Sequence, residues 1–215
     1  MPLPVDARAP TYPERVAEFL IIHGFENHRP ENHWHRHLAT NLRARGHQVA
    51  YPQLPNPDQP VLSQWLEVVD TELQLMKESS AKSVTVIAHS LGCITWLQYL
   101  QKHSSPMTVD RVLLVAPADP QMIAEVAPTF VTNFQIADSA NMLNAQNPTL
   151  LSSDADPWLP RGVLATFAQP LGLTPLIWQG AGHLSRDDGF GYWQGVIDWA
   201  CLLYTSPSPR DATLS

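Results

Sequence analysis

One short stretch of this 215-residue chain combines a strand, a sharp turn and a helix. The β-branched apolar run at residues 84–87 leads into Ala88-His89-Ser90-Leu91-Gly92, and residues 93–101 then follow a helical pattern. The five residues fit the nucleophile-elbow pattern G-x-S-x-G, with alanine in place of the first glycine. Small residues are needed two positions before and two after the serine, because a bulky side chain would collide with the turn. The stretch predicts that Ser90 projects from the carboxyl end of a strand and that the Leu91 N–H faces a reacting carbonyl.

Strand-like and helix-like segments alternate along the rest of the chain. The expected strands are residues 19–22, 48–51, 84–87, 111–116, 149–153 and 174–178. Residues 34–45 are expected to form a helix that ends at Gly46, and residues 62–78 a second helix. This second helix places four apolar residues on one face: Trp65, Val69, Leu73 and Met76. The alternation predicts a three-layer α/β/α sandwich with a mostly parallel six-stranded sheet and right-handed connections.

A serine nucleophile needs a base. In chains with this kind of elbow the order is serine, then aspartate or glutamate, then histidine, and the histidine follows a late strand. The short apolar run at residues 174–179 is followed by Gly180-Ala181-Gly182-His183. His183 therefore lies on a glycine-rich loop just past a predicted strand. We expect His183 to be the general base.

The carboxylate that orients the base should follow the preceding strand. The predicted strand at residues 149–153 is followed directly by Asp154-Ala155-Asp156-Pro157, so two aspartates compete for this role. The proline after Asp156 favours an extended conformation and a fixed turn at that residue. Asp156 is the favoured candidate, and Asp154 is the alternative, with capping or tethering of the loop as its other possible role.

Donors for a developing oxyanion are expected from two backbone positions, each contributing about 3 kcal/mol. One is Leu91. The other follows the strand at residues 19–22, where Gly24 lets the chain turn so that the N–H of Phe25 faces the pocket. His23 and Gly24 are also candidates for substrate binding.

The connection at residues 117–148 is longer than the scaffold needs. Long segments at the carboxyl edge of such sheets often shape pockets. Phe130 and Phe134 are four residues apart and are candidates for the wall of an acyl site. Packing in the core is the alternative for both side chains.

His33 and His37 have the i, i+4 spacing that occurs in metal sites on helices. Trp34 stands where such a motif has a glutamate, and a third ligand is not evident. An exposed polar helix face is the favoured interpretation. We expect neither a metal nor an organic cofactor.

Length and charge limit the classes of partner. A chain of this length fits one domain with a single core. The formal net charge of −7 argues against nucleic acid and anionic membranes as partners. Residues 1–15 lack the apolar run of a secretory signal, and the two cysteines do not make a disulfide framework. These features favour the cytoplasm. The expected partner is a small-molecule acyl substrate, which follows from the serine chemistry and from a chain too short for a large lid.

Residues 201–211, Cys-Leu-Leu-Tyr-Thr-Ser-Pro-Ser-Pro-Arg-Asp, resemble the translation of a transposase sequencing adaptor. We therefore interpret residues 201–215 as a non-native read-through tail. The native domain is expected to span residues 1–200, with its last helix cut short.

Taken together, these motifs resemble the alpha/beta hydrolase family, and within it the small serine hydrolases of the retinoblastoma-binding protein 9 and YdeN type. The likeness spans about residues 19–200 and also includes the proline-rich segment at residues 51–57, followed by Trp65. It implies a triad of Ser90, Asp156 and His183 and a sheet without a large cap domain. The spacing between Asp156 and His183 is similar to that of the family.

Two functional hypotheses follow. The first is a serine hydrolase that cleaves a small ester, thioester or amide through an acyl-enzyme on Ser90, most similar to a carboxylesterase. The second is a catalytically inactive hydrolase-fold module that binds a partner. The histidine on its glycine-rich loop favours the first, because a binding module does not require it. The oligomeric state and the identity of the substrate do not follow from the sequence.

Overall fold

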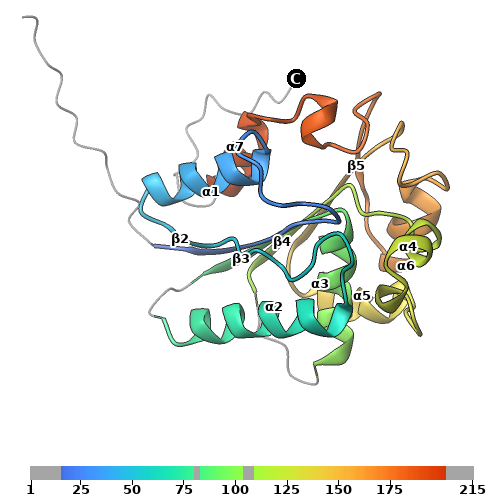
Figure 1. Cartoon of the computed structure of the whole chain (residues 1–215), viewed down its shortest axis with the longest axis horizontal. Coiled ribbons are helices and arrows are strands. Elements are labelled where there is room, and N and C mark those ends of the chain that lie inside the picture. The colour runs from blue at the N-terminus through green and yellow to red at the C-terminus, as the bar shows by residue number, and fades with distance from the viewer. Residues whose placement is uncertain (1–15, 80–82, 104–108, 202–215) are drawn as a thin grey trace, which may run out of the picture.

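A computed structural model describes residues 16–79, 83–103 and 109–201 (Figure 1). Within this part of the chain, six strands form one sheet in the order β2-β1-β3-β4-β5-β6, and all neighbouring pairs are parallel. The strands are β1 (Glu18–Ile22), β2 (Gln48–Ala50), β3 (Val84–His89), β4 (Arg111–Val115), β5 (Pro148–Ser153) and β6 (Leu176–Trp178). The predicted six-stranded parallel sheet is therefore confirmed.

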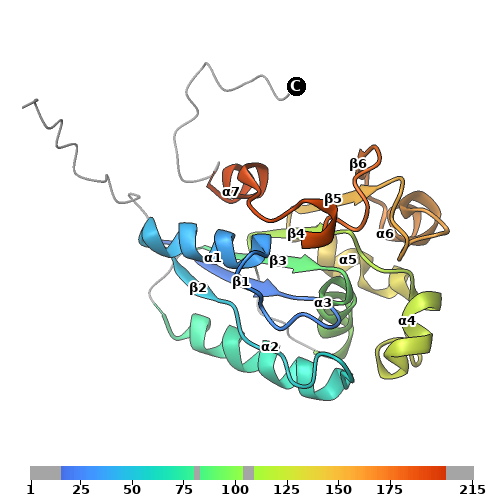
Figure 2. The same cartoon turned by 45° about the horizontal axis from the view of Figure 1, so that its top comes forward.

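Helices cover both faces of the sheet. The α-helices are α1 (Trp34–Ala44), α2 (Leu62–Lys77), α3 (Leu91–Lys102), α4 (Pro120–Val126), α5 (Ala140–Asn144), α6 (Gln169–Leu171) and α7 (Gln194–Cys201). Shorter helical turns lie at Pro128–Phe130, Ile136–Ser139, Leu164–Ala168 and Arg186–Asp188. Figures 1 and 2 show α1 and α7 on one face and α2 and α3 on the other, which gives the predicted three layers.

The alternation of side chains along the central strands divides the core in two. In β1, Leu20 and Ile22 join the cluster under α2 and α3, whereas Phe19 and Ile21 join the cluster under α1 and α7. All four are fully buried. Because each such side chain contributes about 1.5–3 kcal/mol when removed from water, both faces of the sheet must be covered.

Helices α1 and α2 lie close to their predicted ranges, residues 34–45 and 62–78. In α2, Trp65, Val69 and Leu73 are completely buried, as the four-residue spacing requires. Helix α1 ends just before Gly46, whose φ of 86° suits the left-handed conformation after a helix. None of the helices in the described residues is long and apolar enough to span a membrane.

Strand β6 is shorter than predicted and lies at the edge of the sheet. It pairs with β5 over three residues, and Leu176, Ile177 and Trp178 are 54%, 41% and 39% exposed. Pro175 immediately precedes it and has no N–H to donate to a ladder. The strand that leads to His183 is thus the least covered strand of the sheet.

The predicted read-through tail falls mostly outside the described residues, which end at 201. Cys201 itself is the last residue of α7 and is buried in the core cluster under α1 and α7. The assignment of residues 201–215 to a tail stays a prediction.

Candidate active site

Parallel strands deliver their carboxyl ends to one edge of the sheet, and the segments that follow them lie together there (Figure 2). Between β3 and α3, Ser90 has φ 56° and ψ −123°, a conformation that costs about 1–3 kcal/mol. Its N–H donates to the carbonyl of Val115 at 3.0 Å, which holds the turn in place. A Cβ on Gly92 would lie 2.4 Å from the carbonyl oxygen of Ile22, so only glycine fits there. The sharp turn predicted from the sequence is present, and Ser90 stands at its apex.

Ser90, His183 and Asp156 form a continuous chain of hydrogen bonds. The Nε2 atom of His183 lies 2.8 Å from Ser90 Oγ, and its Nδ1 atom lies 2.9 Å from each carboxylate oxygen of Asp156. The carboxylate only accepts, so Nδ1–H donates to it, and in the tautomer with a single proton on Nδ1 the Nε2 atom can accept from the serine hydroxyl. The Asp156 side chain is fully buried, whereas that of His183 is 12% exposed.

The structure separates the two competing aspartates. Asp156 contacts His183, and its Oδ1 also accepts the N–H of Trp158 at 2.9 Å, which fixes the turn after β5. Asp154 instead accepts the N–H of Gly180 through Oδ1 at 2.7 Å. Asp154 therefore tethers the loop that carries the histidine.

Two side chains hold the backbone of His183, and neither is among the candidate residues predicted from the sequence. The N–H of His183 donates to Asp188 Oδ2 at 3.0 Å, and its carbonyl accepts from His89 Nε2 at 2.9 Å. Asp188 also pairs with Ser185 in a capping box. The Ser-x-x-Asp spacing of residues 185–188 is a sequence signal for the capping box of Ser185 and Asp188. The contact made by His89 has no such signal in the sequence.

The loop at residues 23–25, which is expected to hold an oxyanion, lies directly against Ser90. A Cβ on Gly24 would lie 2.8 Å from Ser90 Cβ and 3.2 Å from Ser90 Oγ, so the absence of a side chain permits this approach. Leu91 is the first residue of α3, where a backbone N–H has no acceptor within its own helix. Phe25 follows Gly24 and lines the same pocket as Ser90.

His23 does not line this pocket, contrary to the expectation of substrate binding. It is completely buried: Nδ1 donates to the Gly24 carbonyl at 2.9 Å, and Nε2 accepts the Leu54 N–H at 3.0 Å. Burial lowers the pKa of His23 to about 4, so the ring stays neutral. His23 connects the loop at residues 23–25 to the proline-rich segment, and only Gly24 of the pair reaches the pocket.

Phe130 and Phe134 also lie away from the pocket. Both are buried in the core under α2 and α3, and the Phe130 ring packs against Trp65 with centroids 5.2 Å apart. The alternative of core packing is therefore correct, because the connection at residues 117–148 folds back over α3. Its contribution to the pocket comes from Ile123 in α4.

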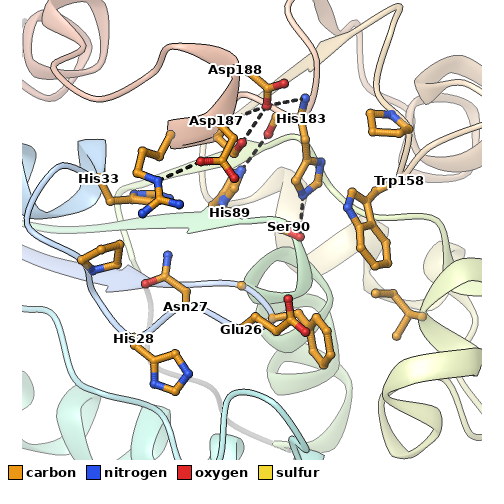
Figure 3. Close-up of a pocket in the computed structure, with 17 residues that line it drawn as sticks. Glu26, Asn27, His28, His33, His89, Ser90, Trp158, His183, Asp187 and Asp188 are labelled. Atoms are coloured by element: carbon orange, nitrogen blue, oxygen red, sulfur yellow. Dashed lines mark hydrogen bonds and ion pairs between the residues drawn. The ribbon is translucent and has the colours of Figure 1, made fainter.

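The pocket around Ser90 has a volume of about 490 Å³ (Figure 3). Its lining includes the apolar residues Phe25, Ile123, Pro157 and Trp158, and Figure 3 shows Trp158 on one side of Ser90. Polar and charged residues lie on the other side of Ser90 in the figure: Asn27, His28, His33 and Asp187. Ser90 therefore stands at a boundary between two chemically different walls.

His33 is not part of an exposed helix face, contrary to the favoured interpretation. It is only 5% exposed and is the N-cap of α1, where its Nδ1 accepts the N–H of His35 at 3.2 Å. A capping side chain points back over the helix terminus, which here borders the pocket. Among the described residues, no group of three or more His, Cys, Asp or Glu has the arrangement of a metal site.

Comparison with known proteins agrees with this geometry. The family model described as serine hydrolase matches residues 19–200. The chain belongs to the serine hydrolase family. The protein YdeN of Bacillus subtilis strain 168 is 29% identical to this serine hydrolase over 178 residues, which cover 80% of this chain and 88% of YdeN.

Solved structures show the same fold. The ydeN gene product of B. subtilis superposes on this serine hydrolase with a TM-score of 0.68 and 23% identity, covering 89% of this chain and all of that one. A YdeN-like hydrolase of Pectobacterium atrosepticum gives 0.65 and 22%, covering 88% and 90%. Est1E of Butyrivibrio proteoclasticus with bound ferulic acid gives 0.66 and 14%, covering 91% and 92%. The chain thus has an alpha/beta hydrolase fold.

Proposed function

We propose that this serine hydrolase cleaves a small ester, thioester or amide through an acyl-enzyme formed on Ser90. The observation that carries the proposal is the hydrogen-bonded chain from Asp156 through His183 to Ser90. The elbow presents Oγ to a pocket of about 490 Å³, which suits a small substrate. A carboxylesterase is the favoured type of activity.

The proposed reaction has two halves. Ser90 Oγ attacks the substrate carbonyl while His183 Nε2 takes the hydroxyl proton, which gives a tetrahedral oxyanion and an imidazolium. Asp156 stabilises the imidazolium through Nδ1–H. The imidazolium then protonates the leaving alcohol, thiol or amine as the bond to it breaks. Water, deprotonated by the same Nε2, attacks the acyl-enzyme in the second half, and Ser90 leaves with its proton restored.

The N–H groups of Leu91 and Phe25 are proposed to bind the oxyanion. The close approach of Gly24 to Ser90 supports this assignment, because it brings the loop at residues 23–25 beside the reacting centre. Preorganised donors of this kind stabilise the developing negative charge by about 3 kcal/mol each.

Labelling with a fluorophosphonate probe tests the proposal. We expect the wild-type protein to be labelled, and the Ser90→Ala and His183→Ala variants to lose labelling. Ser63→Ala is the matched control, because Ser63 is exposed on α2 outside the pocket. Mass spectrometry after addition of p-nitrophenyl acetate should show one acetyl group on the peptide that contains Ser90.

A folded wild-type protein that takes up neither the probe nor an acetyl group would contradict the proposal. That outcome would favour the catalytically inactive binding module. A partner would then be sought with the same pocket as the binding site.

A further inference from the structure

His33 presents a hydrogen-bond donor to the pocket that the proposed reaction does not use. Its Nδ1 accepts the N–H of His35, so Nδ1 is the unprotonated nitrogen and the neutral ring carries its proton on Nε2. Burial lowers the pKa of His33 to about 4, which keeps this tautomer neutral near pH 7. Among the described residues, Nε2 has no hydrogen-bond partner, although the side chain is nearly buried. A donor in this position is available to a ligand.

Asn27 adds a second donor to the same wall. Its Oδ1 accepts the N–H of Arg29 at 2.8 Å, which leaves the side-chain NH₂ as the group for a ligand. Arg186 is less available, because it is paired with Asp187 at 2.9 Å. The wall therefore offers neutral N–H donors in preference to a free cation.

Charges around the pocket disfavour an anionic substrate group at this wall. The carboxylates of Glu26, Asp187 and Asp188 all line the pocket, and Arg186 is the single arginine or lysine among its lining residues. A negatively charged group would lose hydration and meet repulsion here. An uncharged oxygen acceptor meets neither cost.

The opposite wall suits hydrocarbon. Trp158 lies next to His183, with ring centroids 6.2 Å apart, and Phe25 packs near Trp158 at 6.4 Å. Figure 3 shows Trp158 and His33 on opposite sides of Ser90. A scissile carbonyl held at Ser90 therefore has one substituent facing each wall.

This wall is also fixed in place. Asp119, the N-cap of α4, receives two hydrogen bonds from Arg161 and donates its backbone N–H to the carbonyl of Trp158 at 2.8 Å. The backbone carbonyl of Asp119 accepts the N–H of Ile123 at 3.0 Å, so the backbone of Asp119 connects Ile123 to Trp158. The apolar wall is preformed and does not need a substrate to order it.

We propose that the substrate of this site carries an apolar group on one side of the scissile carbonyl, packed on Trp158, and an uncharged oxygen acceptor on the other side, bound by His33 Nε2–H. The inference rests on the proposed function and names the chemical class of its substrate. The acceptor is a carbonyl, ether or hydroxyl oxygen. This oxygen can belong to the acyl part or to the leaving group of the substrate, and the experiment below distinguishes these two positions.

The test compares substrates that differ by one oxygen. The first pair is p-nitrophenyl methoxyacetate and p-nitrophenyl butanoate, where the oxygen lies in the acyl part. The second pair is methoxyethyl acetate and butyl acetate, where it lies in the leaving group. For each pair, the ratio of kcat/KM values is measured in wild type and in His33→Asn. Asn Oδ1 can still cap α1, but the Nε2–H donor is gone.

We expect His33→Asn to lower the ratio by about 3- to 10-fold in one of the two pairs, the loss of one neutral hydrogen bond. The pair that responds identifies the side of the scissile bond that faces His33. His37→Asn is the matched control, because His37 lies on the same helix outside the pocket lining. Trp158→Ala should lower kcat/KM for the alkyl members of both pairs.

Unchanged ratios in both pairs, with the esters still hydrolysed by His33→Asn, would overturn this inference and leave the proposed function standing. Absence of hydrolysis and of fluorophosphonate labelling in the wild-type protein would instead remove the proposed function. A thermal midpoint of His33→Asn close to that of wild type shows that the comparison concerns folded protein.

Discussion

His89 donates a hydrogen bond from Nε2 to the backbone carbonyl of His183 over 2.9 Å. His89 is the last residue of β3 and directly precedes Ser90, so the strand that leads to the proposed nucleophile also holds the backbone of the proposed base. Burial, with a contribution from the neighbouring His183, holds the pKa of His89 well below its usual value. The ring is therefore neutral, and its proton stays on Nε2 for this bond.

The two substitutions His89→Leu and His89→Gln should separate the hydrogen bond from the packing of the ring. Leucine fills the space without a donor, and we expect a fall in kcat of about tenfold or more with little change in KM, because a misplaced base slows the chemical step. Glutamine can place an N–H near the position of Nε2 and should restore most of the activity. Steady-state kinetics on a p-nitrophenyl ester measure both. Equal losses in the two variants would show that the hydrogen bond has no role.

Asp156→Asn should reduce kcat by about a thousand- to ten-thousandfold, because the amide favours the wrong tautomer of His183. Asp154→Asn provides the matched comparison, since its amide oxygen can still accept the N–H of Gly180. This second variant should keep activity within a few-fold of wild type. A large loss in Asp154→Asn alone would reverse the proposed roles.

Gly24→Ala should impair catalysis while leaving the protein folded. The added methyl group would lie 2.8 Å from Ser90 Cβ, so either the nucleophile or the loop at residues 23–25 must move. Displacement of about 1 Å lowers kcat by up to a hundredfold. The rate of fluorophosphonate labelling measures the loss, and circular dichroism checks the fold. Labelling at the wild-type rate would contradict the assignment of this loop to the oxyanion site.

Acid should destabilise the protein through its buried histidines. The pKa values of His23 and His33 fall from 6.5 in the unfolded chain to about 4 in the folded protein, and burial also lowers the pKa values of His35 and His89. Between pH 6.5 and 4 the unfolded state binds more protons, so the free energy of unfolding falls as the pH decreases. Each histidine contributes at most about 1.4 kcal/mol per pH unit.

Urea unfolding at pH 7, 6 and 5 measures this dependence. The steepest fall is expected below about pH 6.5, whereas stability should change little between pH 7 and 8. A constant free energy of unfolding from pH 7 to 5 would contradict the neutral state of the buried rings.

The order of the motifs along the chain was informative because the candidate catalytic residues follow the ends of strands. Ser90, Asp156 and His183 each follow a different parallel strand, and parallel strands deliver their carboxyl ends to one edge. The sequence could therefore predict which loops meet. It left Asp154 and Asp156 open, because a turn of a few residues can direct either carboxylate towards the histidine.

The direction in which a side chain points was the property that the sequence predicted least well. His23 precedes Gly24, yet its ring turns into the core to bond Leu54, a contact made across 31 positions in the chain. The phenyl ring of Phe130 faces Trp65 because its segment folds back over α3. His33 looked like one half of a helical pair with His37, but the helix begins one residue later. Local patterns do not encode these tertiary placements.

The short edge strand β6 has a consequence for the order in which activity and structure are lost. Three exposed residues attach the His183 loop to the sheet, so this corner opens at a lower free energy than the buried centre of the fold. Opening it removes His183 from Ser90 while β1, β3 and β4 stay paired. The enzyme should thus lose activity in mild denaturant before its circular dichroism changes, and amides of residues 176–184 should exchange hydrogen faster than those of β3.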